Sequence, residues 1–150
     1  MTADSILIPL VRTAGGLVTS LLLAFTGDLA ARVFNLLTGF SLDLVVHQNV
    51  NFVAIGLGAG FGAFLGWLNP SFPKYWVFGS LLMILLAAIG GAYAARILGP
   101  GVDTSYWWGR FATDTTVYLG ASTAGLFLAT SLGLISQVML ANRFRGPCRS

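Results

Sequence analysis

Glutamate is absent from this 150-residue chain, and charges of either sign are scarce. The acidic side chains are five aspartates, so carboxylate chemistry is confined to Asp4, Asp28, Asp43, Asp103 and Asp114. Charged residues make up 9% of the sequence, against roughly 25% in an ordinary soluble domain. A water-soluble fold is excluded, because a soluble domain of this size could not hide so much apolar surface.

Cysteine and histidine occur once each. Cys148 alone excludes an intrachain disulfide and any metal site with several cysteine ligands. We expect His47 to be a polar residue at the membrane interface, and Ser122 to bond its own helix backbone rather than to act with His47 in catalysis. The sequence therefore predicts no catalytic residue, no metal and no cofactor.

Apolar residues dominate the composition. They make up 56% of the chain, and the mean hydropathy is +0.82. Four stretches with few or no charges approach or exceed the roughly 20 residues that a spanning helix needs. We predict a single all-α domain over residues 1–150, a polytopic integral membrane protein with four transmembrane helices. The expected spans are about 9–31, 50–68, 75–97 and 110–141, with a basic tail at 142–150.

Residues 32–44 continue the helical spacing of apolar side chains beyond the first span. Val33, Leu36, Leu37 and Phe40 recur at this spacing, with polar residues between them. The pattern predicts a short amphipathic helix lying along the membrane surface. An extension of the first helix beyond the bilayer is the competing interpretation. Pro9 is expected in the first turn of that helix.

The distribution of basic residues orients the four spans. One side would carry Arg12, Lys74, Arg143, Arg145 and Arg149 against Asp4 alone. The other would carry Arg32, Arg96 and Arg110 against the four remaining aspartates. The positive-inside rule then places both termini in the cytoplasm and the protein in the cell (inner) membrane. Trp67, Tyr75 and Trp76 would mark the inner interface, and Tyr106, Trp107 and Trp108 the outer one. The scattered basic residues do not predict nucleic-acid binding.

Small residues recur at four-residue spacing in every predicted span, most clearly in the second. Such ladders let helix backbones approach closely, which is a main source of helix association in lipid. The ladders predicted to pack are Ala54, Gly58, Gly62 and Gly66; Ala121, Gly125, Ala129 and Gly133; Ala87, Gly91 and Ala95; and Gly16, Ser20 and Ala24. They predict packing but do not identify the partner helix.

The alternating glycines at 56, 58, 60 and 62 resemble the glycine-rich helix of rotary-ATPase proteolipids. Proteolipids also need a carboxylate near mid-membrane, and no predicted span places an aspartate near its centre, so their function is not implied. The ionisable residues Asp28, Arg32, Arg96, Arg110 and Asp114 are expected to mark helix ends and to extend toward the membrane surface. The alternative is that they meet in an outer charged cluster with a functional role.

These patterns favour a non-catalytic membrane subunit. It would pack through its glycine- and alanine-rich helix faces into a larger complex, as an assembly, stabilising or regulatory component. The expected partners are membrane lipids and other integral membrane subunits or further copies of itself. Two alternatives remain open, a homo-oligomeric or holin-like pore and a component of a transporter or membrane enzyme whose site is shared with a partner.

Overall fold

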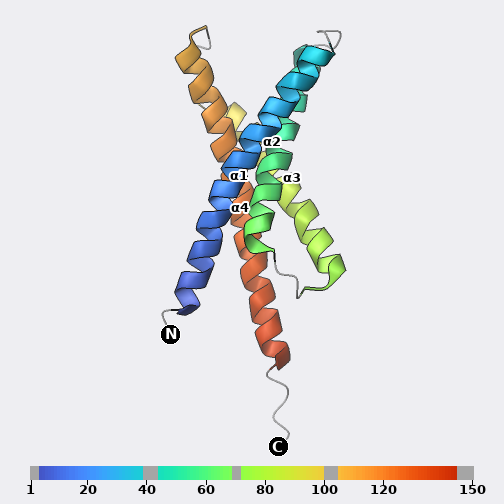
Figure 1. The fold of residues 1–150 in the computed structure, drawn as a ribbon, viewed down its shortest axis with the longest axis vertical. Coiled ribbons are helices and arrows are strands. Elements are labelled where there is room, and N and C mark those ends of the chain that lie inside the picture. Colours follow the sequence, from blue (N-terminus) through green and yellow to red (C-terminus); the bar gives the residue numbers. More distant parts are fainter. Residues whose placement is uncertain (1–3, 39–43, 69–71, 100–104, 145–150) are drawn as a thin grey trace, which may run out of the picture.

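The computed structural model describes residues 4–38, 44–68, 72–99 and 105–144. Four helices account for nearly all of them: α1 (Asp4–Leu37), α2 (Leu44–Trp67), α3 (Lys74–Leu98) and α4 (Trp107–Phe144) (Figure 1). Each helix is long and apolar enough to cross a membrane. The all-α class and the four candidate spans predicted from the sequence are confirmed, and they indicate a multi-pass membrane protein.

The predicted surface helix after the first span is not present as a separate element. α1 runs without interruption through Leu37, and the Thr38 N–H closes its last turn on the Phe34 carbonyl at 3.0 Å. No glycine or proline interrupts residues 28–37, so the helix continues, as the alternative interpretation had it. Residues 39–43 lie outside the described part of the chain.

The start of α1 differs from the prediction, and both ends of α3 have a clear local cause. α1 begins at Asp4, so Pro9 lies in its second turn rather than its first, where it removes only one backbone hydrogen bond. α3 begins after Pro73, whose carbonyl accepts from the N–H groups of Trp76 and Val77 at 3.0 and 3.1 Å. α3 ends where the Gly99 N–H donates to the Ala95 carbonyl at 2.9 Å.

The four helices form two pairs that cross and then diverge. α1 lies alongside α2, and α3 alongside α4. At the end where α1 finishes and α4 begins, the two pairs splay apart, and α1 begins and α4 ends at the opposite end (Figure 1). Consecutive spans run in opposite directions, so with four of them the first helix starts on the side where the last one ends.

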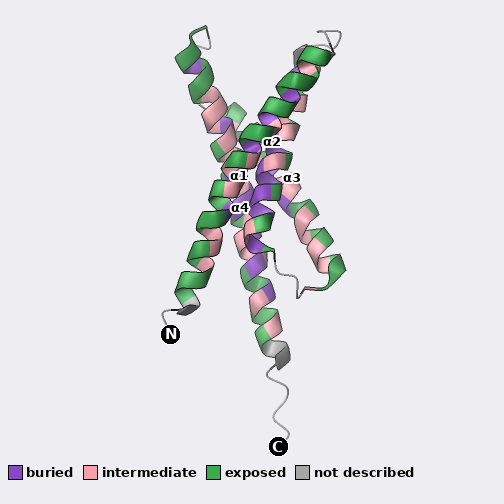
Figure 2. Ribbon diagram, viewed as in Figure 1, coloured by how far each residue is buried: buried purple, intermediate pink, exposed green. Residues whose placement is uncertain are grey.

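The interior is built mainly from small residues, and the large apolar side chains face outward. Ala24, Ala59, Ala88 and Ala121 are all 0% exposed at the crossing, where Figure 2 shows the buried positions gathered. A second cluster contains Phe64, Trp67, Ile84, Leu126 and Ala129. An arrangement with small residues inside suits a lipid solvent, in which close backbone approach and not hydrophobic burial drives helix association.

Trp67, predicted to mark the inner interface, is packed inside the bundle. The residue is 5% exposed and belongs to the second cluster. Its ring lies against Gly133 of α4, where a Cβ atom would overlap the indole. This packing could not be predicted, because the position of a tryptophan at a span end does not reveal a glycine that faces it on another helix, and the depth of Trp67 in the membrane stays a prediction.

A polar cluster between α1 and α4

The alternating glycines of α2 face two different helices. Gly58, Gly62 and Gly66 lie against the backbone of α1, and a Cβ atom added to Gly62 would come within 2.5 Å of the Ser20 backbone. Gly56 and Gly60 lie against α3, at Ile89 and Leu85. One row of glycines therefore packs against α1, and the glycines that alternate with it pack against α3.

Because α1 and α2 approach closely, hydroxyl groups on α1 donate hydrogen bonds to backbone carbonyls of α2. Ser20 Oγ donates to the Ala59 carbonyl at 2.7 Å, and Thr19 Oγ1 donates to the Gly62 carbonyl at 2.8 Å. Helix carbonyls already accept within their own helix, and these bonds use their second lone pair. The hydroxyls reach them only because glycines keep the two backbones near.

The remaining residues of the predicted ladders also lie largely inside the bundle. Gly16, Ser20 and Ala24 of α1, and Ala121, Gly125, Ala129 and Gly133 of α4, are buried. Gly91 and Ala95 of α3 meet Gly120 of α4, and the Ala54 carbonyl lies beside Gly27. Ala87 is half-buried. These small faces are used for contacts within this chain, which the sequence pattern alone could not tell from contacts with a partner.

Charged side chains of α1 and α4 meet at the splayed end of the bundle. Asp28 Oδ2 accepts two hydrogen bonds, one from Arg32 Nε and one from Tyr118 Oη, both at 2.7 Å. Arg32 Nη2 donates to Asp114 Oδ2 at 2.8 Å. We call Asp28, Arg32, Asp114 and Tyr118 the α1–α4 polar cluster.

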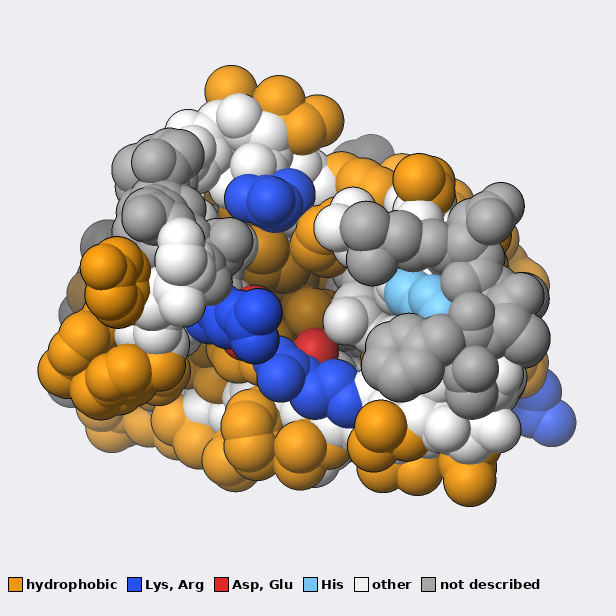
Figure 3. Space-filling view, turned by 90° about the horizontal axis from the view of Figure 1, so that it is seen from above, with side chains coloured by type: hydrophobic (Ala, Val, Ile, Leu, Met, Phe, Trp, Pro, Cys, Tyr) orange, Lys and Arg blue, Asp and Glu red, His pale blue; other side chains and the backbone are white. Residues whose placement is uncertain are grey.

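Exposure falls steeply across this cluster. The Asp28 side chain is 5% exposed, whereas those of Arg32 and Asp114 are 52% and 41% exposed. Figure 3, seen from this end, shows basic side chains gathered over a hollow with acidic atoms beneath them. Asp28 thus lies inside the bundle and not at a helix end, because α1 continues past it to Leu37.

Local geometry explains how the cluster forms. Asp28 and Arg32 are one turn apart on α1, with the acid before the base, which is the favoured order for an ion pair on a helix. Asp114 and Tyr118 have the same spacing on α4. Phe25 packs edge-on against Tyr118, with ring centroids 6.5 Å apart, and supports the tyrosine beside Asp28. Two charge-assisted hydrogen bonds offset the cost of burying the carboxylate.

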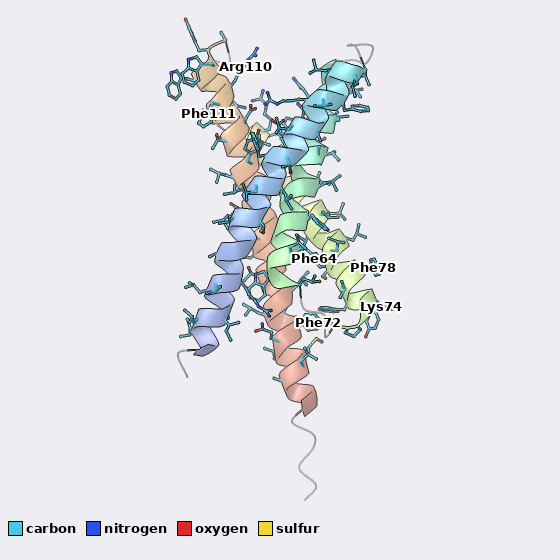
Figure 4. All side chains as sticks on the ribbon, viewed as in Figure 1. Phe64, Phe72, Lys74, Phe78, Arg110 and Phe111 are labelled. Carbon is cyan, nitrogen blue, oxygen red and sulfur yellow. The ribbon has the colours of Figure 1, made fainter. Side chains whose placement is uncertain are left out.

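The structure brings together three of the five residues named for an outer cluster in the alternative interpretation. Arg96 lies exposed in the last turn of α3 and forms no ion pair with any residue that the structure describes. Arg110 is exposed near the start of α4 (Figure 4). Tyr118 was not predicted, although its position one turn after Asp114 repeats the spacing of Asp28 and Arg32.

Two further polar contacts lie along the first half of α2. Asn35 Nδ2 donates to Asn51 Oδ1 at 3.0 Å, and Tyr93 Oη donates to Asn49 Oδ1 at 2.8 Å. They tie α2 to α1 and to α3. Interhelical polar bonds of this kind contribute about 0.6 kcal/mol each on average in membranes.

The other residues considered for chemistry are Ser122 on α4 and His47 on α2. Ser122 is fully buried, and its hydroxyl has no hydrogen-bond partner among the described residues, so the expected bond to its own helix is not seen. His47 lies in the first turn of α2 and is 8% exposed, which corrects its expected place before that helix. In the described ranges no three metal-ligating side chains come together.

The α1–α4 polar cluster links α1 to α4. Arg32 bridges carboxylates on both helices, and Tyr118 adds a second link to Asp28. Comparison of the chain with protein-family models, with curated proteins and with solved structures found no match.

Proposed function

We propose that the protein is a non-catalytic membrane subunit that packs against another integral membrane protein through the outward face of α3. The observation that carries this proposal is open space at Gly79 and Gly90, where an added Cβ would meet nothing within 4 Å. A glycine costs about 1 kcal/mol relative to alanine inside a helix. The glycines of α2 offset that cost through contacts with α1 and α3, whereas Gly79 and Gly90 have no such contact with the described residues.

A shallow groove between α3 and α4 extends the same face. Its small residues include Gly91, Ala94, Ala95 and Gly120, and its larger apolar ones include Leu98 and Phe127. A floor of small residues beside large apolar ones suits a transmembrane helix with apolar side chains. The partner we propose is accordingly another membrane-spanning helix and not a soluble domain.

In this proposal the α1–α4 polar cluster has a structural role. It holds the two helix pairs together at the end where they diverge, and so keeps the α3 face in a fixed orientation for assembly. We also propose that the protein lies in the cell membrane with both termini in the cytoplasm. The excess of basic residues on the side of the termini favours this orientation.

Replacing Gly90 with leucine tests the docking face. Tagged Gly90→Leu is extracted from native membranes in mild detergent, and Gly15→Leu is the matched control because Gly15 of α1 also has open space around it. We expect wild type and Gly15→Leu to co-purify with the same membrane protein. Gly90→Leu should retain at least about tenfold less of it, which corresponds to about 1.4 kcal/mol.

Two results would contradict the proposal. A wild-type chain that runs as a monomer with no co-purifying membrane protein would remove its basis. Dye leakage from liposomes that contain the chain alone would favour the pore alternative, whereas tight vesicles agree with a subunit.

A further inference from the structure

An aromatic crevice lies at the opposite end of the bundle from the polar cluster. Phe72, Pro73, Tyr75 and Trp76 line one side, at the start of α3, and Ser136, Met139 and Leu140 line the other, on α4. Its volume is about 250 Å³. Figure 4 shows Phe72 and Lys74 beside the start of α3 at this end.

A second, smaller space lies beside this crevice. A smaller chamber of about 20 Å³ shares Phe72, Trp76 and Ser136 with the outer crevice. Phe64 and Trp67 also line this chamber. Trp67 is 5% exposed, and its indole N–H has no hydrogen-bond partner in the described part of the chain. A buried donor without an acceptor is costly, so this indole calls for an acceptor beyond the described residues.

The volume and the lining of the crevice restrict the kind of molecule that can supply this acceptor. Pockets that hold whole small molecules begin at about 300 Å³, so a crevice of 250 Å³ fits part of a larger molecule whose remainder lies outside it. The walls are mostly aromatic and aliphatic, which suits a hydrocarbon chain. Lys74, exposed between two lining residues, supplies a positive charge for an anionic group at the mouth.

We propose that this crevice binds one acyl chain of a membrane phospholipid, with the ester carbonyl of that chain accepting a hydrogen bond from Trp67 Nε1. The aromatic residues Tyr75 and Trp76 belong to the types enriched at headgroup level, just outside the depth of lipid esters. The site is separate from the α3 docking face and does not depend on the function proposed above.

Lipids with and without the ester carbonyl distinguish this proposal from a buried water. The protein is reconstituted in nanodiscs of a diester phosphatidylglycerol or of its diether analogue, which keeps the headgroup and the chains but lacks the carbonyls. The Trp67 indole resonance is identified by its loss in Trp67→Phe. We expect its N–H to exchange with deuterium about threefold to tenfold more slowly in the diester lipid, and native mass spectrometry to show a similar excess of retained diester lipid.

Trp107→Phe is the matched control, because Trp107 is an exposed tryptophan at the opposite end of the bundle, outside this crevice. It should keep the preference for the diester lipid, whereas Trp67→Phe should lose it. Equal exchange and equal retention in the two lipids for wild type would overturn the proposal and leave a trapped water as the acceptor. The wild-type comparison decides the question even where Trp67→Phe fails to fold.

Discussion

At the scale of single residues, the polar cluster depends on one carboxylate oxygen. Asp28 Oδ2 takes both the Arg32 guanidinium and the Tyr118 hydroxyl at 2.7 Å. With two carboxylates and one guanidinium, the cluster carries one more negative than positive formal charge. The tyrosine is the only member that adds a donor without adding charge, so its removal tests the link between α1 and α4 most cleanly.

Replacing Tyr118 with phenylalanine should lower the free energy of unfolding by about 1 kcal/mol, because the hydrogen bond to Asp28 is lost while the ring still packs against Phe25. Reversible unfolding in bicelles measures the change. Thr115→Val is the control, since the Thr115 hydroxyl bonds only the Phe111 carbonyl of its own helix at 2.7 Å. Equal effects of the two substitutions would show that the tyrosine contributes nothing as a cross-helix link.

At the scale of helices, α2 is defined by its two rows of glycine. The row of Gly58, Gly62 and Gly66 fits α1, and the row of Gly56 and Gly60 fits α3. A methyl group in either row would push two backbones apart, and one in the row that faces α1 would also lengthen the Ser20 and Thr19 bonds to α2 carbonyls. The same methyl group at Gly79 or Gly90, on the outward face of α3, would meet none of the described residues.

Gly62→Ala should therefore destabilise the protein by about 1–3 kcal/mol, the usual cost of overpacking. Gly79→Ala, with open space around the added methyl, should instead stabilise the isolated protein by up to about 1 kcal/mol because alanine favours helix. Steric-trapping measurements of unfolding in bicelles would compare the two. A neutral Gly62→Ala would mean that α1 and α2 pack less closely than the structure has them.

At the scale of the whole molecule, the antiparallel path of the four helices places the start of α1 and the end of α4 on one side. The side that carries the termini also has the larger excess of basic residues. Because the bias in Lys and Arg sets orientation, that side is expected to face the cytoplasm.

Cysteine labelling measures this orientation. The native Cys148 should resist a membrane-impermeant maleimide in intact cells and react after the membrane is opened. Tyr106→Cys in a Cys148→Ser background should react in intact cells, because Tyr106 is 69% exposed at the opposite end of the bundle. The reverse pattern would show the opposite orientation.

Much of this architecture could be read from the sequence, and the remainder depended on which helices meet. Apolar length predicted the four spans, and i, i+4 spacing placed Asp28 beside Arg32. Tyr118 could not be predicted, because its role depends on the crossing of α1 and α4. The extent of α1 was also ambiguous, since the spacing of Val33, Leu36 and Leu37 fits a surface helix and a longer span equally well. The burial of Trp67 could not be predicted, because Gly133, against which it packs, lies on another helix.

The division of the polar cluster between α1 and α4 has a consequence for biosynthesis. α1 and α2 are synthesised before α3 and α4, and their glycine and hydroxyl contacts with each other need neither of the later helices. Asp28 then has only Arg32, whose opposite charge one turn away lowers the cost of inserting α1 into lipid. Asp114 and Tyr118 arrive with α4, so the cluster is complete only once α4 is in place. A chain truncated before α4 would leave Asp28 without the hydrogen bond from Tyr118.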